Sequence, residues 1–153
     1  MSLIIYEDTP PSDKWLRAIL TLPVMIIAAT ALSLTLTQEW EGALFLLAEA
    51  TLVSLLMILI LPRKYRILDD RIEIVLGGPF RFNIPFKTIK GVRNATWKSV
   101  GINLPTSLSL KNGAEIVRKR CLSVNITPGD RQAFIENLEK AMKSWSVYYQ
   151  RIA

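Results

Sequence analysis

The sequence contains no histidine and only one cysteine, Cys121. Without histidine, the chain cannot build a Ser-His-Asp or Cys-His nucleophilic site, or a histidine-ligated metal centre. With a single cysteine it cannot form a CxxC redox pair or an internal disulfide. Most familiar catalytic machinery is therefore excluded, and we expect no catalytic residue, no metal site and no cofactor.

Charged side chains are almost absent from two long stretches near the N-terminus. Residues 18–37 carry no charge, and residues 43–61 carry only Glu49. At ~1.5 Å of helical rise per residue, each stretch reaches about 30 Å, the thickness of the hydrocarbon core of a bilayer. Because only five residues separate the stretches, we expect an antiparallel helical hairpin that crosses a membrane twice.

The positive charges around these stretches predict the orientation of the hairpin. Lys14 and Arg17 precede the first stretch, whereas Arg63, Lys64 and Arg66 follow the second. The connecting loop has no Lys or Arg, and positive side chains favour the cytoplasmic side. We therefore expect a multi-pass integral protein of a bacterial plasma or internal membrane, with both termini in the cytoplasm.

A cleaved signal peptide is the competing interpretation of the first stretch. Ala29, Thr30 and Ala31 resemble a cleavage site after a charged leader. The leader, however, contains acidic residues, and a second apolar stretch follows at once. Both features favour a membrane span.

Glu49 is the residue of the hairpin with the strongest functional potential. An ionisable group at membrane depth is costly unless it meets a partner or water. Glu49 lies six residues into its stretch, which is ~9 Å from the outer boundary by helical rise. Two interpretations of Glu49 stay open: a functional contact, or a carboxylate that is tolerated because it lies at a shallow depth. The first interpretation leads to an alternative function, an oligomeric transport or channel subunit.

We divide the chain into a cytoplasmic N-terminal segment (residues 1–14), a two-helix transmembrane hairpin (15–62) and a cytoplasmic domain (63–153). The last part holds 17 Lys and Arg against 7 Asp and Glu. Beneath an anionic leaflet, each basic residue near the surface gains about 1 kcal/mol of attraction. We expect lipid headgroup contacts at Arg63, Lys64 and Arg66, and an anionic-lipid sensor is a further alternative function.

The first half of this domain alternates between apolar and polar residues, as strands with one buried face do. Ile72, Ile74 and Leu76, for example, alternate with Arg71 and Glu73. We predict seven strands, at residues 65–68, 71–76, 81–85, 89–96, 107–110, 115–120 and 122–126. Ahead of the hairpin, residues 4–6 either add an edge strand to this domain or dock elsewhere.

The end of the chain has the period of a helix. Thr127 is a potential N-cap, Pro128 suits the first helical position and Asp130 places an acid in the first turn. An apolar stripe then follows at helical spacing, formed by Phe134, Leu138, Ala141 and Trp145. Trp145, Tyr148 and Tyr149 are candidates for partner docking, and alternatives are burial against the sheet and contact with headgroups.

Three motifs resemble the bacterial pleckstrin-homology-like domains that occur beside membrane hairpins. They are YRILDDRIEI at residues 65–74, IPFKTIKGV at 84–92 and VNITP at 124–128. The resemblance implies an α+β fold, with a seven-stranded antiparallel barrel or sandwich closed by a C-terminal helix. It also implies a binding or assembly scaffold. Eukaryotic relatives grip inositol phosphates around a long basic first hairpin loop, but here that loop is only Asp69 and Asp70, so this ligand is not carried over.

These features together predict a non-enzymatic integral membrane scaffold, accessory subunit or assembly factor. Its basic cytoplasmic domain would dock a partner protein or complex at the membrane surface. We expect membrane lipids and other membrane proteins as partners and leave a homo-oligomer open. Since the sequence carries no nucleic-acid-binding module, we expect no nucleic acid partner.

Overall fold

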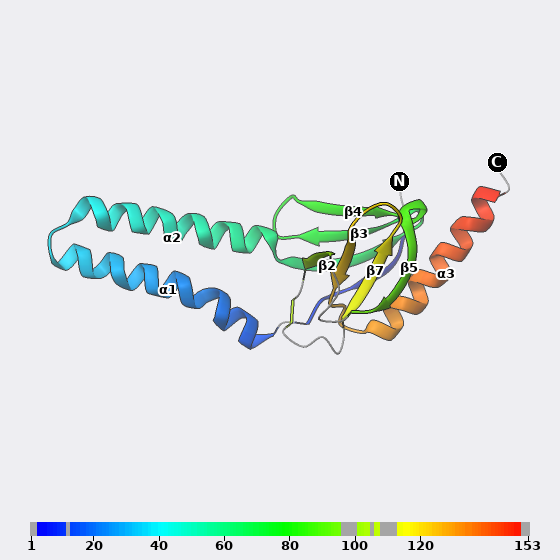
Figure 1. The fold of residues 1–153 in the computed structure, drawn as a ribbon, viewed down its shortest axis with the longest axis horizontal. Helices are drawn as coiled ribbons and strands as arrows, with labels where there is room; N and C mark the ends of the chain where they lie inside the picture. The colour runs from blue at the N-terminus through cyan, green and yellow to red at the C-terminus, as the bar shows by residue number, and fades with distance from the viewer. Residues whose placement is uncertain (1–2, 12, 96–100, 105, 108–112, 151–153) are drawn as a thin grey trace.

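The computed structural model consists of a helical hairpin, two β-sheets and a C-terminal helix (Figure 1). It describes residues 3–11, 13–95, 101–104, 106–107 and 113–150, without the side chains of the last two. The elements are, in chain order, β1 (Ile4–Asp8), α1 (Lys14–Leu36), α2 (Trp40–Ile60), β2 (Pro62–Leu68), β3 (Arg71–Leu76), β4 (Arg81–Pro85), a 3-10 turn (Phe86–Thr88), β5 (Ile89–Asn94), β6 (Gly101–Leu104), β7 (Ala114–Arg118), β8 (Ser123–Ile126) and α3 (Arg131–Gln150).

The expected hairpin is present, and both of its helices are long and apolar enough to cross a membrane by length and composition. The first helix begins at a capped end, where the Asp13 carboxylate accepts the N–H of Trp15 at 2.9 Å. It ends in a Schellman-type turn. Gln38 has a φ of 63°, and the Glu39 N–H donates to the carbonyl of Leu34 at 3.0 Å. The chain thus reverses within a few residues.

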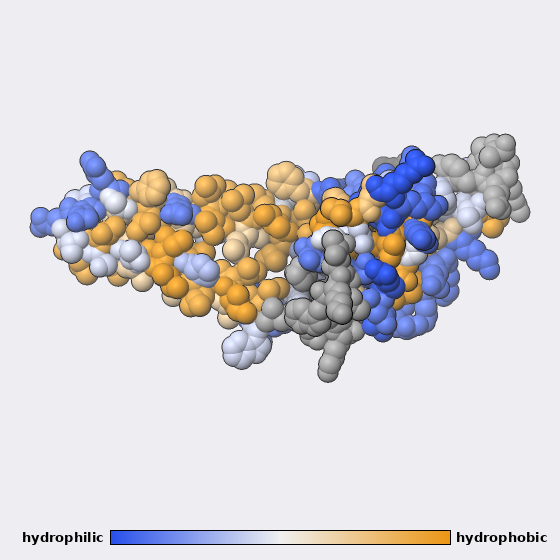
Figure 2. All heavy atoms as spheres, viewed as in Figure 1, coloured by the Kyte–Doolittle hydropathy of each residue, from blue (hydrophilic) through white to orange (hydrophobic). Residues whose placement is uncertain are grey.

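Small residues form the contact between α1 and α2. Ala31, Ala43 and Ala50 are the buried side chains of the two helices, and they let the backbones approach closely. Large apolar side chains point outward instead: Met25 is 67% exposed and Phe45 is 70% exposed. Apolar side chains therefore cover the visible surface along most of the hairpin (Figure 2).

The strands form two four-stranded sheets. Of the barrel or sandwich that the resemblance implied, the closed barrel is not present, and the strands are not all antiparallel. The first sheet has the order β1-β2-β3-β4, and the second has the order β5-β7-β8-β6. Within the second sheet, β6 and β8 run parallel. A strand that the sequence did not predict, β6, lies between β5 and β7 in the chain at residues 101–104. Of the strand predicted at 107–110, Ser107 is in a bend, and residues 108–110 lie outside the described part.

The parallel pairing explains why β6 was not predicted. Gly101 lies beside Ser123, and a Cβ on Gly101 would come within 2.3 Å of the Ser123 carbonyl oxygen. A side chain there would push β6 away from β8. The pairing depends on a residue more than twenty positions along the chain, whereas an alternating pattern reports only local structure.

β1 precedes the hairpin and pairs with β2, which follows it. The register is antiparallel and runs from Ile4 opposite Leu68 to Asp8 opposite Tyr65. Of the two alternatives left open for residues 4–6, the structure has the edge strand. Both ends of the hairpin are consequently fixed in the same sheet.

The core lies between the sheets and α3, and its centre is aromatic. Phe134 of α3 meets Tyr6 and Tyr65 edge-to-face, with ring centroids 6.3 and 6.4 Å apart. The Tyr65 hydroxyl lies 3.4 Å from the Leu104 carbonyl oxygen, and burial raises the pKa of Tyr65 to about 12. The other fully buried large side chains are Phe86, Ile67, Ile72, Ile74, Ile84, Ile116, Ile126, Leu138, Glu115 and Val124.

α3 begins after Asp130, so the prediction of Thr127 as its N-cap was wrong. Asp130 is the cap, because its carboxylate accepts a backbone N–H of the first turn at 3.0 Å. Thr127 is buried, its N–H donates to the hydroxyl of Tyr65, and its carbonyl accepts the hydroxyl of Thr106, each at 3.4 Å. These two bonds hold Thr127 outside the helix.

The turn between β3 and β4 packs against the end of α2. The Gly77 N–H donates to the Leu61 carbonyl at 3.0 Å, which satisfies one of the orphan carbonyls at the helix end. Gly77 is buried, and a Cβ added there would lie 1.6 Å from the carbonyl oxygen of Ile58. Only glycine permits this approach between the hairpin and the first sheet.

Replacing Gly77 with alanine should therefore destabilise the junction. A Cβ that overlaps a backbone carbonyl forces the backbone to shift, at a cost of about 2 kcal/mol. The matched control is Gly91→Ala in β5, where an added Cβ meets no atom within 4 Å, and it should stay within about 0.5 kcal/mol of wild type. Thermal unfolding of the full-length variants in detergent measures both, and equal melting temperatures would contradict the contact.

Candidate functional site at the base of the hairpin

Five charged side chains cross the outer face of the first sheet, with at least one from each strand. Glu7 of β1 accepts from Lys64 and from Arg66 of β2, both at 2.6 Å. Arg66 also reaches Glu73 of β3 at 3.4 Å, and Arg81 of β4 reaches the same carboxylate at 3.3 Å. We call this set of five residues the charge ladder.

The register of the strands creates the charge ladder. Glu7 lies opposite Arg66, which lies opposite Glu73, so opposite charges meet on one face of the sheet. The Glu73 side chain is only 8% exposed, with arginines from both neighbouring strands paired to it. Two of the expected headgroup residues, Lys64 and Arg66, therefore lie in ion pairs within the domain.

The ion pairs change the proton affinity of their members. Hydrogen bonds from Lys64 and then Arg66 hold the pKa of Glu7 below its usual value. The same contact with Glu7 raises the pKa of Arg66. The charge ladder is accordingly most stable with Glu7 ionised.

Arg63, the third expected headgroup residue, lies outside the charge ladder. It is the extra residue in an irregularity of β2, because Pro62 pairs with Leu76 whereas Lys64 already pairs with Val75. Such bulges redirect a side chain relative to its neighbours. Arg63 is exposed and makes no ion pair with any described residue.

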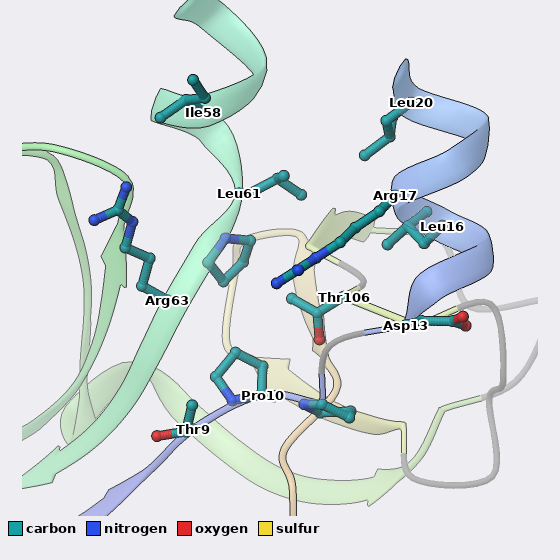
Figure 3. Close-up of a pocket in the computed structure, with 12 residues that line it drawn as sticks. Thr9, Pro10, Asp13, Leu16, Arg17, Leu20, Ile58, Leu61, Arg63 and Thr106 are labelled. Carbon is teal, nitrogen blue, oxygen red and sulfur yellow. The ribbon is translucent and has the colours of Figure 1, made fainter. Parts of the chain in front are cut away.

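Beside Arg63, the hairpin and the first sheet enclose a cavity of about 350 Å³ (Figure 3). The segment between β1 and α1 forms one side, and the junction of α2 and β2 forms the other. The side chain of Arg17 extends from α1 into this space, and Arg63 of β2 also lines it. Residues that line the cavity include Thr9, Asp13, Arg17, Ile58, Leu61 and Thr106.

Glu49 lies on the exposed surface of α2. The side chains of α2 that are buried against α1 are Ala43 and Ala50. A contact of the Glu49 carboxylate with another protein group would therefore come from outside this hairpin. A pore that uses Glu49 would have to form between chains.

The expected docking residues of α3 separate into two groups. Trp145 packs edge-to-face on Phe86, with ring centroids 6.2 Å apart, and so contributes to the domain. Val147 and Tyr148 are 45% and 64% exposed. The side chain of Tyr149 lies outside the described part of the structure.

A row of polar side chains on the second sheet was not anticipated from the sequence. Arg93, Glu115, Asn125 and Asn103 lie opposite one another on four successive strands. The Arg93 guanidinium donates two hydrogen bonds to the Glu115 carboxylate, of 2.8 and 2.9 Å, and the Glu115 side chain is 1% exposed. Contact with Glu115 raises the pKa of Arg93. Only the strand register could have revealed this row, and register is not visible in a local pattern.

The comparison with known protein families decides the family. A family model described as Bacterial PH domain matches residues 63–142, which is more than half of the chain. This chain belongs to the bacterial PH domain family. No curated protein and no solved structure matches it.

The matched region of this bacterial PH domain begins at β2, so the hairpin and β1 precede it. It ends at residue 142, ahead of Trp145, Val147 and Tyr148. The edge strand and the exposed end of α3 are thus additions of this chain to the matched region.

The first hairpin loop of this bacterial PH domain is short and acidic. Asp69 and Asp70 form the turn between β2 and β3, and Asp70 lies 3.6 Å from Arg71. Two carboxylates at this turn would repel a phosphate. Within the described ranges, no group of three or more acidic or cysteine side chains is placed to hold a metal ion.

The charge ladder predicts how stability depends on pH. Because the pKa of Glu7 is lower in the folded protein than in the unfolded chain, its ion pairs stabilise the fold fully above the usual value of 4.5. This contribution disappears as the pH falls through the lowered pKa. Glu7→Gln should therefore lose less thermal stability than wild type between about pH 6 and about pH 3.

The control for this experiment is Glu139→Gln, at an exposed position of α3 whose carboxylate pairs with no described residue. Its melting temperature should fall on acidification as much as that of wild type. Identical pH profiles for Glu7→Gln and Glu139→Gln would show that the charge ladder adds nothing to stability.

Proposed function

We propose that this bacterial PH domain protein is a non-enzymatic integral membrane scaffold. In this proposal the hairpin spans the bilayer, and the domain docks a partner protein or complex at the membrane surface. The observation that carries the proposal is the pairing of β1 with β2 across the hairpin. Because both ends of the hairpin enter one sheet, insertion of the hairpin holds the domain directly against the lipid.

The exposed surface of the helices supports membrane insertion. Large apolar side chains cover the hairpin, including Leu22 and Ile26, each 59% exposed. Soluble monomers rarely expose apolar patches beyond a few hundred Å². A bilayer provides an apolar environment of about 30 Å for two such helices, which satisfy their backbone hydrogen bonds internally.

The charges support a cytoplasmic domain. Lys14, Arg17 and Arg63 lie at the base of the hairpin, whereas the tip carries Glu39 and Glu41 without any Lys or Arg. This asymmetry matches the positive-inside preference of membrane proteins. Both termini and the domain would then lie in the cytoplasm.

The end of α3 is the proposed docking surface. In Figure 1 the end of α3 and the tip of the hairpin lie at opposite ends of the molecule. Val147 and Tyr148 would thus face the cytoplasm and not the headgroup layer. Exposed aromatic side chains of this kind anchor protein interfaces well.

The single cysteine provides a test of the topology. Cys121 is exposed in the turn between β7 and β8, so a membrane-impermeant maleimide should label it only after the cells are opened. In a Cys121→Ser, Glu39→Cys double variant, the thiol at the tip of the hairpin should be labelled in intact cells. The opposite pattern, or release of the protein from membranes by alkaline carbonate, would refute the proposed arrangement.

Site-specific photocrosslinking tests the docking surface. A photoreactive residue in place of Tyr148 should give a discrete adduct with a partner protein in native membranes, since that position is exposed beyond the packed part of α3. The same group in place of Glu139, also exposed on α3, should give none. Identical adducts from both positions would argue against a specific surface at the end of α3.

A further inference from the structure

The two helices of the hairpin separate toward the domain. Figure 1 shows them side by side at the connecting turn and further apart where they meet the sheets. Small side chains at the tip allow close contact, as where Gly42 lies against Leu34. Near the base, Thr9 and Pro10 follow β1, and α1 begins only at Lys14. Two adjoining cavities lie between the helices at this end, and we call them together the cleft.

The cleft is apolar on its side toward the tip. A cavity of about 350 Å³ lies there, and side chains such as Leu20, Val24 and Met57 line it. Two hydroxyl groups also face it, but each is bonded to its own helix. Thr21 donates to the Arg17 carbonyl at 3.0 Å, and Ser54 donates to the Ala50 carbonyl at 2.7 Å. This part of the cleft consequently offers no unsatisfied hydroxyl to a ligand.

The cleft becomes polar toward the domain. The adjoining cavity at the hairpin base shares Arg17, Leu20, Ile58 and Leu61 with the apolar one, and it adds Thr9, Asp13 and Thr106. A molecule in the cleft would thus meet polar groups at one end and hydrocarbon at the other.

Arg17 supplies the charge at the polar end. It makes no ion pair with any described residue, and its side chain extends across the space between the two helices (Figure 3). Asp13 lies nearby, but its carboxylate accepts bonds from the Trp15 N–H and, at 3.2 Å, from the Ser107 hydroxyl. The lining holds two arginines, Arg17 and Arg63, against the single carboxylate of Asp13. An anionic group in the cavity would therefore find its counter-charge in these arginines, of which Arg17 also lines the apolar cavity.

We propose that the cleft binds one anionic phospholipid of the cytoplasmic leaflet. Its phosphate would lie at Arg17, and one acyl chain would extend past Leu20 toward Val24 and Met57. This inference rests on the proposed insertion of the hairpin, which places the polar end of the cleft at headgroup depth. The direction of the polarity gradient is that of a lipid in this leaflet.

The order of the groups along the cleft favours a phospholipid over a helix of a second chain. Arg17 lies where the two cavities meet, and apolar side chains such as Leu20, Val24 and Met57 follow toward the tip. A phospholipid carries its phosphate and its acyl chain in this same order.

Native mass spectrometry of the full-length protein tests the proposal. The protein, purified in mild detergent, is offered equal amounts of phosphatidylglycerol and phosphatidylcholine. We expect one retained phospholipid per chain, with a preference for phosphatidylglycerol. Arg17→Gln should reduce that preference about fivefold, the effect of about 1 kcal/mol for one basic residue at an anionic headgroup. Lys14→Gln, which removes an exposed cation one turn away that lines neither cavity, should leave the preference unchanged.

A second pair of variants tests the apolar part of the cleft. Val24→Trp fills the cavity and should abolish lipid retention, whereas Leu22→Trp, at an exposed position on the same helix, should not. Three results would each overturn the inference. They are lipid retention by Val24→Trp, a loss of the phosphatidylglycerol preference in Lys14→Gln equal to that in Arg17→Gln, and a dimer that holds no lipid. Release of the wild type by carbonate would instead refute membrane insertion, and a membrane-bound protein that retains no lipid would refute only the cleft.

Discussion

The arrangement of this molecule depends on the pairing of β1 with β2. The pairing joins Asp8 to Tyr65, and so closes the chain around the whole hairpin. Closing so long a flexible loop costs conformational entropy, but the packed helices reduce that cost because they already bring the two ends of the loop together. The strand also connects to the C-terminal helix, since the Asp130 N–H donates to the Asp8 carboxylate at 3.3 Å. One short edge strand thus links hairpin, sheet and α3.

The same pairing decides which positive charges stay available. A count along the sequence suggests a strongly basic region after the second helix, with Arg63, Lys64 and Arg66 in close succession. β1 brings Glu7 to the last two of these residues, while β3 brings Glu73 to Arg66. The charge ladder is therefore nearly neutral as a unit. Of the three basic residues after α2, Arg63 alone stays outside the charge ladder. In the proposed membrane arrangement, Arg63 would lie at the hairpin base with Arg17, close to the lipid headgroups.

Features with a local period were predictable from the sequence, and features set by distant contacts were not. The buried faces of residues 71–76 and the apolar stripe of α3 follow periods of 2 and 3.6 residues, and both are confirmed. The partner of β1, the parallel position of β6 and the pairing of Arg93 with Glu115 depend on register between segments far apart in the chain. Thr127 shows the same limit, because a tertiary contact with Tyr65 overrides a good local capping signal. The family resemblance located the domain but not these contacts.

The cleft between the helices follows from the topology and is not a defect of packing. β1 and β2 are neighbours in a sheet, but five residues separate β1 from α1, whereas a single residue separates α2 from β2. The helices must converge again to turn at Gln38, so a wedge of space stays open at the base. An apolar cavity left empty loses the dispersion contacts of its lining. In a bilayer the surrounding lipid can restore those contacts, and Arg17 at the mouth of the wedge favours a lipid with a negative headgroup.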